Sequence, residues 1–348
     1  VMVTGASGYI AGWIVKDLLE AGHTVHATVR NPDKAKSVDH LKRLAESAPG
    51  TLKLFKADLL DADSFDAPMQ GCDILMHTAS PFVLDGFTDA HEALVRPAVE
   101  GTRNVLNAAN RCDTLKRVVL TSSVASVYGD ATDMKGKSAF TEADWNSTSS
   151  VNHNPYQYSK VAAEREAWKI HDAQGGDAAS RWDLVTINPS LVVGPGINPN
   201  ATSESFDILR QFGDGTAKPG VPDVGIGVVD VREVAEAHLR AAYLPEANGR
   251  YILSGHDTDF PEMAAVLRRR FGKKYPIPKR TLPKAAVWLF GPLVNKTLSR
   301  KFVSRNVNHP WRADNSRSRE QLGIQYRSLE ESLNEFFQQL VDSGQFKK

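Results

Sequence analysis

Residues 4–12 read TGASGYIAG and follow directly on an apolar run, VMV, at residues 1–3. A helix-type spacing of apolar residues begins at Tyr9, so the glycines lie between a predicted strand and a predicted helix. Gly5 and Gly8 have no Cβ atom, which lets the backbone turn tightly and approach a pyrophosphate at the N-terminus of the helix. We therefore expect the strand, turn and helix that open a dinucleotide-binding α/β domain.

Two further observations concern the third small residue of the loop and the length of the strand before it. Ala11 takes the third small-residue position of the pattern, which mainly sets how closely the helix packs on the strand, so alanine fits there. Only three residues precede Thr4, whereas a strand normally has about five. We expect that further residues precede Val1 in the natural chain.

Strand-type and helix-type patterns alternate through the first half of the chain. Helical spacing is found near 33–47, 91–112 and 155–174. The predicted strands are short apolar runs: HTVHATV (23–29), TLKLFKA (51–57), DILMHTA (73–79), RVVLTSS (117–123) and DLVTINP (183–189). Because such alternation builds right-handed βαβ units, we predict an α/β fold with a doubly wound parallel Rossmann sheet.

The pattern changes in the second half. Residues 195–227 are rich in Gly, Pro and Asn, and the sequence after Gly255 indicates short helices with little strand signal. The segments at 224–243 and 249–255 indicate a strand, a helix and a strand that return to the first domain. We predict a Rossmann domain and a smaller, mostly helical C-terminal substrate lobe, with these bounds: 1–190 plus about 228–254, and about 191–227 plus 255–348.

The charge balance excludes some classes of partner. The 348 residues include 42 Lys and Arg against 41 Asp and Glu, a net charge of +1, so no overall field attracts nucleic acid or an anionic membrane. The longest apolar stretch, Ala285 to Val294, is far shorter than the ~20 residues of a membrane span. A small molecule is the expected partner, and the chain is expected to be a monomer or a homodimer.

The two cysteines give no sign of a metal or redox site. Neither Cys72 nor Cys112 belongs to a CxxC motif or a Cys/His cluster, so we expect a reducing, cytoplasmic location and no metal. His77 ends a predicted strand without other ligands nearby in the sequence, which favours a structural role.

The end of the second predicted strand indicates which cofactor binds. NAD-binding folds place an acid there, about 20 residues after the glycine loop, to hold the ribose 2′-hydroxyl. Here the strand ends in Arg30, with Lys34 soon after, and such cations suit the 2′-phosphate of NADP. At the end of the third strand, Asp58 and Leu59 are candidates to hold the adenine, although a helix N-cap is an equal alternative for Asp58.

Residues 154–160, NPYQYSK, predict the start of a helix with Asn154 as its N-cap and Pro155 at its first position. Tyr156 and Lys160 are four residues apart and share one helical face, so an ammonium group lies close to the phenol. We expect this cation and the positive end of the helix to lower the pKa of Tyr156 from ~10 by about two or three units. The alternative is a buried tyrosine and a surface lysine paired with Glu164.

Ser123 ends the predicted strand at 117–123, at the carboxyl edge where open α/β sheets carry their sites. A turn-forming serine is the alternative for this position. Taken with the glycine loop and the Tyr156/Lys160 helix, Ser123 is expected to polarise a substrate carbonyl. The three residues then predict a reversible hydride transfer between the cofactor and a carbonyl or alcohol, with Tyr156 as the proton donor.

Several segments, in this order along the chain, resemble one family. TGASGYIAG, HATVRNPDKAK, KADL, HTASPF, VVLTSS, NPYQYSK, NPSLVVGP, VDVREVAEAHL and GRYILSG look like segments of the extended short-chain dehydrogenases/reductases. The resemblance is to the branch of dihydroflavonol reductase, cinnamoyl-CoA reductase and yeast methylglyoxal reductase. HTASPF and Ala11 look most like the yeast aldehyde and ketone reductases.

The resemblance implies roles for particular residues. It implies Ser123, Tyr156 and Lys160 as the catalytic triad, with Arg30 and Lys34 at the 2′-phosphate. The complete set of expected cofactor-binding residues is Gly5, Ala6, Ser7, Gly8, Tyr9, Ile10, Arg30, Lys34, Asp58, Leu59, Ala79, Ser80, Tyr156, Lys160, Pro189, Ser190 and Ser203.

The expected substrate is an aldehyde or ketone. The NWYCY-type segment of cinnamoyl-CoA reductases is absent, which argues against a CoA thioester. Tyr128 stands where dihydroflavonol reductases carry an Asn, which argues against a flavonoid. Phe82, Val83 and Tyr128 follow strands at the cofactor edge and are expected to line an apolar pocket together with Ser123 and Tyr156, with core packing as the alternative for the first three.

Two other functions remain open at this point. A nucleotide-sugar epimerase or dehydratase shares the SVYG segment (126–129) and the Tyr/Lys pair. Dehydratases of that kind carry an acid directly after the serine strand, where this chain has Val124 and Ala125. A non-catalytic NADP-binding sensor is the second alternative, although such proteins generally lose the Tyr or the Lys.

Overall fold

A parallel sheet forms the centre of the molecule. The computed structural model describes residues 1–80, 89–175, 181–198, 203–295 and 297–346. In these ranges seven parallel strands pair in the order β10-β6-β5-β4-β1-β2-β3. Their bounds are β1 (Met2–Thr4), β2 (Thr24–Val29), β3 (Thr51–Lys56), β4 (Ile74–His77), β5 (Arg117–Thr121), β6 (Asp183–Pro189) and β10 (Gly249–Leu253). The strand order reverses between β1 and β4, and such a switch point is where open α/β sheets bind ligands.

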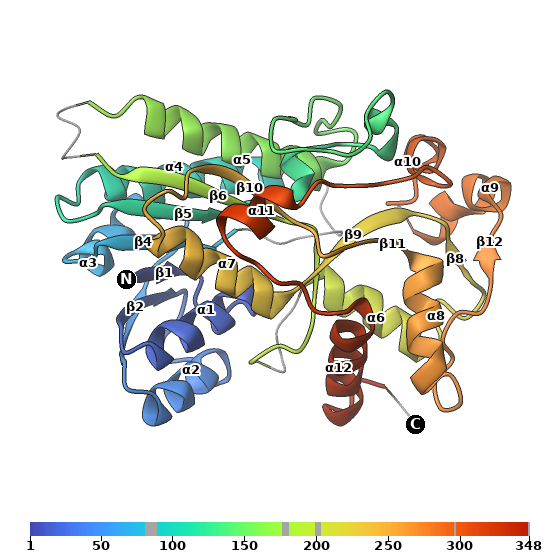
Figure 1. Cartoon of the computed structure of the whole chain (residues 1–348), viewed down its shortest axis with the longest axis horizontal. Coiled ribbons are helices and arrows are strands. Elements are labelled where there is room, and N and C mark those ends of the chain that lie inside the picture. The colour runs from blue at the N-terminus through green and yellow to red at the C-terminus, as the bar shows by residue number, and fades with distance from the viewer. Residues whose placement is uncertain (81–88, 176–180, 199–202, 296, 347–348) are drawn as a thin grey trace.

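Helices cover both faces of this sheet (Figure 1). One face carries α1 (Tyr9–Glu20), α2 (Ala35–Ser47) and α7 (Val231–Tyr243), while the other carries α3 (Asp66–Met69), α4 (Arg96–Asn110) and α5 (Pro155–Asp172). Short helical turns lie between them: η1 (Ala62–Phe65), η2 (His91–Val95), η3 (Val124–Ser126) and η4 (Ala131–Met134). The predicted doubly wound Rossmann fold is confirmed.

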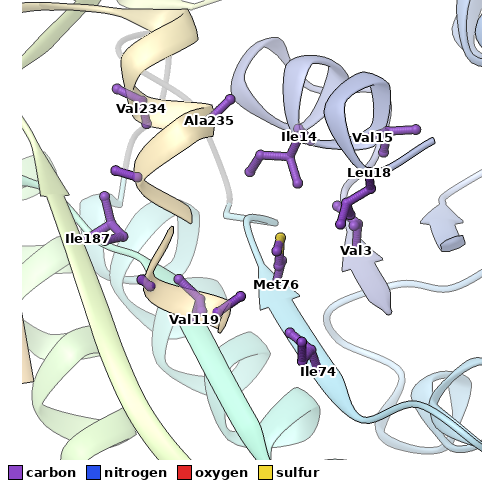
Figure 2. Packing of buried hydrophobic residues seen from close by; sticks show 14 of the residues in the cluster. Val3, Ile14, Val15, Leu18, Ile74, Met76, Val119, Ile187, Val234 and Ala235 are labelled. Carbon is purple, nitrogen blue, oxygen red and sulfur yellow. The ribbon is translucent and has the colours of Figure 1, made fainter. Parts of the chain in front are cut away.

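The inner strands β1, β4 and β5 are mostly apolar because both of their faces are buried, whereas the edge strand β3 is partly exposed. Figure 2 shows the α1/α7 side, where Ile14 and Leu18 of α1 lie over Val3 and Met76 of the sheet, and Val234 of α7 belongs to the same hydrophobic core. All five of these side chains are fully buried. Burying one such side chain stabilises the fold by roughly 1.5–3 kcal/mol.

The C-terminal part contains two small sheets and several helices. β7 (Leu191–Val193), β9 (Gly225–Asp230) and β11 (His256–Asp259) form one sheet, and β8 (Val221–Pro222) pairs with β12 (Thr281–Leu282). The helices are α6 (Glu204–Asp214), α8 (Phe260–Phe271), α9 (Lys284–Val294), α10 (Arg300–Asn306), α11 (Ser316–Gln321) and α12 (Leu329–Asp342). No helix in the described ranges is long and apolar enough to span a bilayer.

The predicted return of the chain to the first domain is correct for two of its three elements. Helix α7 packs on α1, and β10 pairs with β6 at the edge of the central sheet. Strand β9 instead pairs with β7 and β11, so it belongs to the small sheet. An apolar run predicts a strand, but distant partners decide which sheet it joins.

Candidate active site

The ends of β1, β4 and β5 lie side by side at the switch point and carry much of the predicted site. Gly5, directly after β1, has φ of 63°, a left-handed conformation that favours glycine. A Cβ atom at Gly5 would lie 3.0 Å from the Cα atom of Ala79, which follows β4. Glycine is therefore required here both by the turn and by the close approach of the two strand ends.

Thr4 and His77 hold these two strand ends together. The Thr4 Oγ1 accepts from the backbone N–H groups of Thr78 and Ala79, each at 3.1 Å, and lies 2.8 Å from His77 Nδ1. Because two N–H groups occupy its lone pairs, the Thr4 hydroxyl donates to Nδ1, which places the imidazole proton on Nε2. Burial, with a smaller effect from the Lys160 charge, lowers the pKa of His77 to about 3, so it stays neutral.

Helix α5 brings the predicted tyrosine and lysine to this edge. Pro155 is its first residue, and Tyr156 lies in the first turn. The Lys160 Nζ lies 5.4 Å from the centroid of the Tyr156 ring and donates to the Ser80 Oγ at 2.9 Å. The i, i+4 spacing thus brings Tyr156 and Lys160 together as expected, and Ser80 joins them from the segment after β4.

The expected lowering of the Tyr156 pKa is wrong for this structure. Burial raises the pKa of Tyr156, and the charge of Glu204 raises it further. Burial also changes the lysine: it lowers the pKa of Lys160 to about 8. The phenol is therefore protonated at neutral pH, while the ammonium is close to its titration range.

Asn154 stands before α5, but its side chain does not cap the helix as predicted. Its backbone is left-handed, with φ of 54° and ψ of 57°. The Nδ2 donates to the Gly129 carbonyl at 2.8 Å and to the Asp130 Oδ1 at 3.1 Å. Asparagine is among the residues that tolerate this conformation, and here it fixes the chain just ahead of Tyr156.

Ser123 is the N-cap of η3 and stands two residues after the last residue of β5 (Thr121), so the strand is two residues shorter than predicted. Its Oγ accepts from the backbone N–H of Ala125 at 3.1 Å, so the turn-forming role considered for this serine is present. A hydroxyl that accepts in this way still has its own proton to donate. The turn and the expected polarising role are therefore compatible.

Glu164 is a site residue whose role sequence analysis missed. It lies one turn after Lys160 on α5, where a surface pair with a lysine was the alternative considered. Instead its buried carboxylate accepts from Ser122 Oγ (2.5 Å), Arg250 Nε (2.6 Å), Asn188 Nδ2 (2.8 Å), Thr186 Oγ1 (3.3 Å) and Ser126 Oγ. Because Ser122 precedes Ser123, this carboxylate ties the helix of Tyr156 to the serine strand.

The predicted cofactor cations lie at the end of β2. Arg30 directly follows that strand and Lys34 is the N-cap residue of α2, and both are exposed. Asp58, after β3, is exposed too, and its Oδ1 accepts from the Leu60 N–H at 3.0 Å. One carboxylate oxygen of Asp58 thus closes a turn. The N-cap position of the next helical turn, η1, is Asp61, so the alternative of a helix N-cap at Asp58 is wrong.

Three residues expected at the cofactor use their side chains elsewhere. The Tyr9 hydroxyl donates to the Gly194 carbonyl, and its ring packs against Phe206 and Phe336 of the C-terminal lobe. The half-buried Ile10 packs against the hydrophobic core clusters. The Ser190 hydroxyl, after the buried Pro189, donates to the Leu253 carbonyl at 3.1 Å. Their side chains therefore stabilise the fold around the loop.

Ser203 and the glycine loop test whether a dinucleotide fits. Ser203 precedes α6, does not cap it, and has a buried hydroxyl that lacks a hydrogen-bond partner among the described residues. Gly5, Ala6, Ser7 and Gly8 lead into the N-terminus of α1, and Gly8 is exposed. An unsatisfied buried hydroxyl and an open helix N-terminus both suit phosphate or ribose oxygens.

The expected substrate residues divide into two groups. Phe82 and Val83 lie outside the described residues. Tyr128 is half-buried, and its ring packs against Phe140 and Trp311 with centroids 4.9 and 5.6 Å apart. Burial raises the pKa of Tyr128, as does the charge of Glu204. Glu204 therefore acts on both tyrosines, although nothing in the sequence around it indicated this.

The chain is similar to known reductases. The sequence profile of the NAD dependent epimerase/dehydratase family matches residues 1–253. Cinnamoyl-CoA reductase CAD2 of Medicago truncatula is 40% identical over 276 residues, 78% of this chain and 80% of that protein. Tetraketide alpha-pyrone reductase 1 of Arabidopsis thaliana is 36% identical, covering 99% of this chain and 96% of that protein.

A solved structure shares the fold along nearly the whole chain. The yeast methylglyoxal/isovaleraldehyde reductase Gre2, solved with NADPH, superposes with a TM-score of 0.78 at 27% identity, covering 99% of both chains. The resemblance drawn from the sequence motifs is thereby confirmed. The chain belongs to the NAD-dependent epimerase/dehydratase family and, within it, to the extended short-chain dehydrogenases/reductases, in the branch of the cinnamoyl-CoA and tetraketide α-pyrone reductases.

Proposed function

We propose that this reductase uses NADPH to reduce the carbonyl group of an aldehyde or ketone, with Tyr156, Lys160 and Ser123 as its catalytic residues. The observation that carries the proposal is the contact of Lys160 with both the Tyr156 ring and Ser80, beside the glycine loop. A phenol, an ammonium group and a serine hydroxyl at one sheet edge are the groups that a carbonyl reduction needs.

NADPH as the cofactor is supported by charge and by similarity. Arg30 and Lys34 place two exposed cations after β2, and Arg30 stands directly after the strand, where NAD-binding folds carry the acid that holds a bare ribose hydroxyl. The similar yeast reductase Gre2 was solved with NADPH. Gly5, Gly8 and the N-terminus of α1 would hold the pyrophosphate, and the orphaned Ser203 hydroxyl is a further candidate contact.

The residues then have distinct tasks in the reduction. The bound nicotinamide supplies the hydride that the carbonyl carbon receives. Ser123 donates a hydrogen bond to the carbonyl oxygen, and the protonated phenol of Tyr156 gives that oxygen its proton. Lys160 stabilises the negative charge that develops on the phenol oxygen, and solvent later returns the proton to Tyr156. Alcohol oxidation is the same sequence in reverse.

An aldehyde or ketone is favoured over the other substrates. The name of the similar yeast protein includes methylglyoxal and isovaleraldehyde, which are carbonyl compounds. The chain lacks the NWYCY-type segment of cinnamoyl-CoA reductases and carries Tyr128 at the position of the flavonoid-binding Asn. The SVYG segment and the Tyr156/Lys160 pair suit an epimerase as well, but the similar proteins at 36–40% identity are reductases.

A direct assay tests the proposal. NADPH and NADH oxidation would be followed with aldehydes, ketones, a cinnamoyl-CoA thioester, a flavanonol and UDP-sugars. We expect NADPH-dependent turnover of the simple carbonyl compounds and, for Tyr156→Phe, loss of turnover with NADPH binding retained. Near-normal rates in that variant would refute the role of Tyr156, and conversion of UDP-sugars alone would favour the epimerase.

A further inference from the structure

Helix α9 exposes an unusual amount of apolar surface. The exposed fractions are 41% for Trp288, 49% for Leu289, 57% for Phe290, 83% for Leu293 and 85% for Val294. Among the described residues only two other large hydrophobic side chains are exposed, Leu60 and Tyr243, and they lie far from α9 in the sequence. An apolar patch concentrated on one helix marks an interaction site.

The segment that contains α9 is also strongly basic. Residues 263–313 include 13 Lys and Arg and no Asp or Glu, although the net charge of the whole chain is only +1. The rest of the chain is therefore acidic, with a net charge of −12. The overall balance that argued against an anionic partner hides this local excess of positive charge.

One of these cations lies against an apolar side chain of α9, and others are near the helix in the sequence. The Arg300 guanidinium, at the start of α10, is 4.7 Å from the centroid of the Trp288 ring. Lys301 is exposed beside it, and the exposed Lys279 and Arg280 directly precede β12, which leads into α9. Figure 1 shows α9 and β12 at the right-hand end of the molecule, away from the strands of the central sheet.

We propose that the exposed side chains of α9 and the cations around them bind peripherally to an anionic lipid bilayer. Leucine, valine and aromatic side chains can enter the boundary between headgroups and acyl chains, while Lys and Arg contact lipid phosphates. A second copy of this chain is a poorer occupant, because self-association through the patch would bring two basic segments together. The membrane proposal is independent of the proposed reductase activity.

Vesicle sedimentation with the full chain tests the proposal. The probes are vesicles of phosphatidylcholine alone and of phosphatidylcholine with about 30% phosphatidylserine. We expect binding to the anionic vesicles, weak binding to the neutral ones, and a decrease of binding as salt rises from ~50 to ~500 mM. Absence of binding to anionic vesicles at low salt, or equal and salt-independent binding to both, overturns the proposal.

Matched variants separate the two parts of the surface. Two variants should each reduce vesicle binding at least about tenfold. The first changes the apolar residues Leu289, Phe290, Leu293 and Val294 together to Ser. The second changes the cations Lys279, Arg280, Arg300 and Lys301 together to Glu. Leu60→Ser is the control for the apolar variant, because Leu60 is exposed but lies outside the patch. The control for the charge variant changes the exposed Lys36, Lys42, Lys53 and Lys135 together to Glu. This control should bind the anionic vesicles more strongly than the variant with Glu at the four patch cations.

Solution behaviour supplies the remaining readout. All the changed side chains are exposed, so the circular dichroism spectrum and the melting temperature of each variant should match those of the unmodified protein. Analytical ultracentrifugation follows the oligomeric state. A dimer that the Ser substitutions dissociate, together with no vesicle binding, would overturn the proposal and identify the patch as a contact between copies.

Discussion

The ammonium group of Lys160 titrates close to neutral pH, because burial lowers its pKa to about 8. The folded protein therefore keeps the charge below pH 8 and loses it as the pH rises through that value. The charge stabilises the phenolate character that Tyr156 acquires when it gives up its proton. We expect kcat/KM for carbonyl reduction to fall above about pH 8, approaching tenfold per pH unit.

The pH profile of kcat/KM between about pH 6 and 10 checks this expectation. Lys160→Arg is the matched variant, since a guanidinium stays charged throughout this range. Its residual activity should lack the fall near pH 8. A profile for the unmodified enzyme that stays flat to pH 10 would contradict the role given to the ammonium group.

Arg30 is the second residue whose chemistry makes a measurable prediction. A charge-assisted contact with a phosphate is worth roughly 1.5–3 kcal/mol, so Arg30→Asp should weaken NADPH binding by about 10- to 100-fold. Binding of NADH should stay the same or improve, since Asp can accept from the ribose hydroxyl. Cofactor titration by fluorescence measures both, with the exposed Arg43, on α2, changed to Asp as a control. Equal losses for NADPH and NADH would argue against a 2′-phosphate site at Arg30.

The site residues differ in how far sequence alone could predict them. The Tyr156/Lys160 contact follows from helix geometry, which spacing fixes. The direction of the Tyr156 pKa shift depends on burial, which is a property of the folded molecule and was predicted wrongly. Asn154 was placed correctly before α5, but its left-handed backbone and its bond to Asp130 depend on residues 24 positions away.

At the scale of elements, the buried carboxylate of Glu164 joins α5 to β5, β6 and β10. Glu164→Gln keeps the shape of the side chain but removes the negative charge that faces the buried Arg250. Breaking one partner of such a pair typically costs about 3–5 kcal/mol. We expect a loss of that order in the free energy of unfolding, measured by urea denaturation.

The neighbouring pair of Arg103 and Glu166 provides the control for this variant. Glu166 also lies on α5 and its Oε1 is 2.8 Å from the Arg103 Nε, but 46% of the arginine side chain is exposed. Exposed pairs contribute about 0–1 kcal/mol, so Glu166→Gln should change stability little. Similar losses in both variants would mean that burial of the Glu164 pair has no special importance.

The strands and helices of the first half were predicted well, because each has a strong local pattern. The runs at 51–57 and 183–189 correspond to β3 and β6 almost residue for residue. Strand β9 was assigned to the wrong sheet, since VGIGVVD specifies a strand without specifying its partners. The role of Glu164 was missed for a related reason, since its partners Ser122 and Arg250 are 42 and 86 residues away.

For the whole molecule, the two parts of the chain meet at Asp130, which is completely buried. Its Oδ1 accepts from the Asn306 Nδ2 at 2.8 Å, and its Oδ2 is 3.1 Å from the Arg305 Nη1 and 2.8 Å from the His153 Nε2. Although burial favours the neutral acid, these contacts hold the pKa of Asp130 below its usual range. Asp130 thus joins α10 to Asn154, two residues before Tyr156.

This junction predicts that a change in α10 reaches the catalytic helix. Asn306→Ala removes the amide that donates to Asp130 and that accepts from the Ala131 N–H at 2.8 Å. Two buried groups lose a partner, so the free energy of unfolding should fall by about 2–4 kcal/mol. Because Asp130 also holds Asn154, we expect kcat for carbonyl reduction to fall as well, while NADPH affinity, which depends on the glycine loop and Arg30, stays unchanged.

Three measurements on Asn306→Ala separate this coupling from a simple loss of stability. Urea denaturation gives the free energy of unfolding, fluorescence titration gives the NADPH affinity, and initial rates below the unfolding transition give kcat and KM. Ser304→Ala is the control, since the hydroxyl of this exposed serine donates to the Arg300 carbonyl of the same helix, at 2.8 Å, and the substitution leaves the backbone carbonyl of residue 304 in place. If Asn306→Ala is destabilised but keeps its full kcat, the junction only holds the lobe in place; a lower kcat with unchanged NADPH affinity means that α10 positions Tyr156 through Asp130 and Asn154.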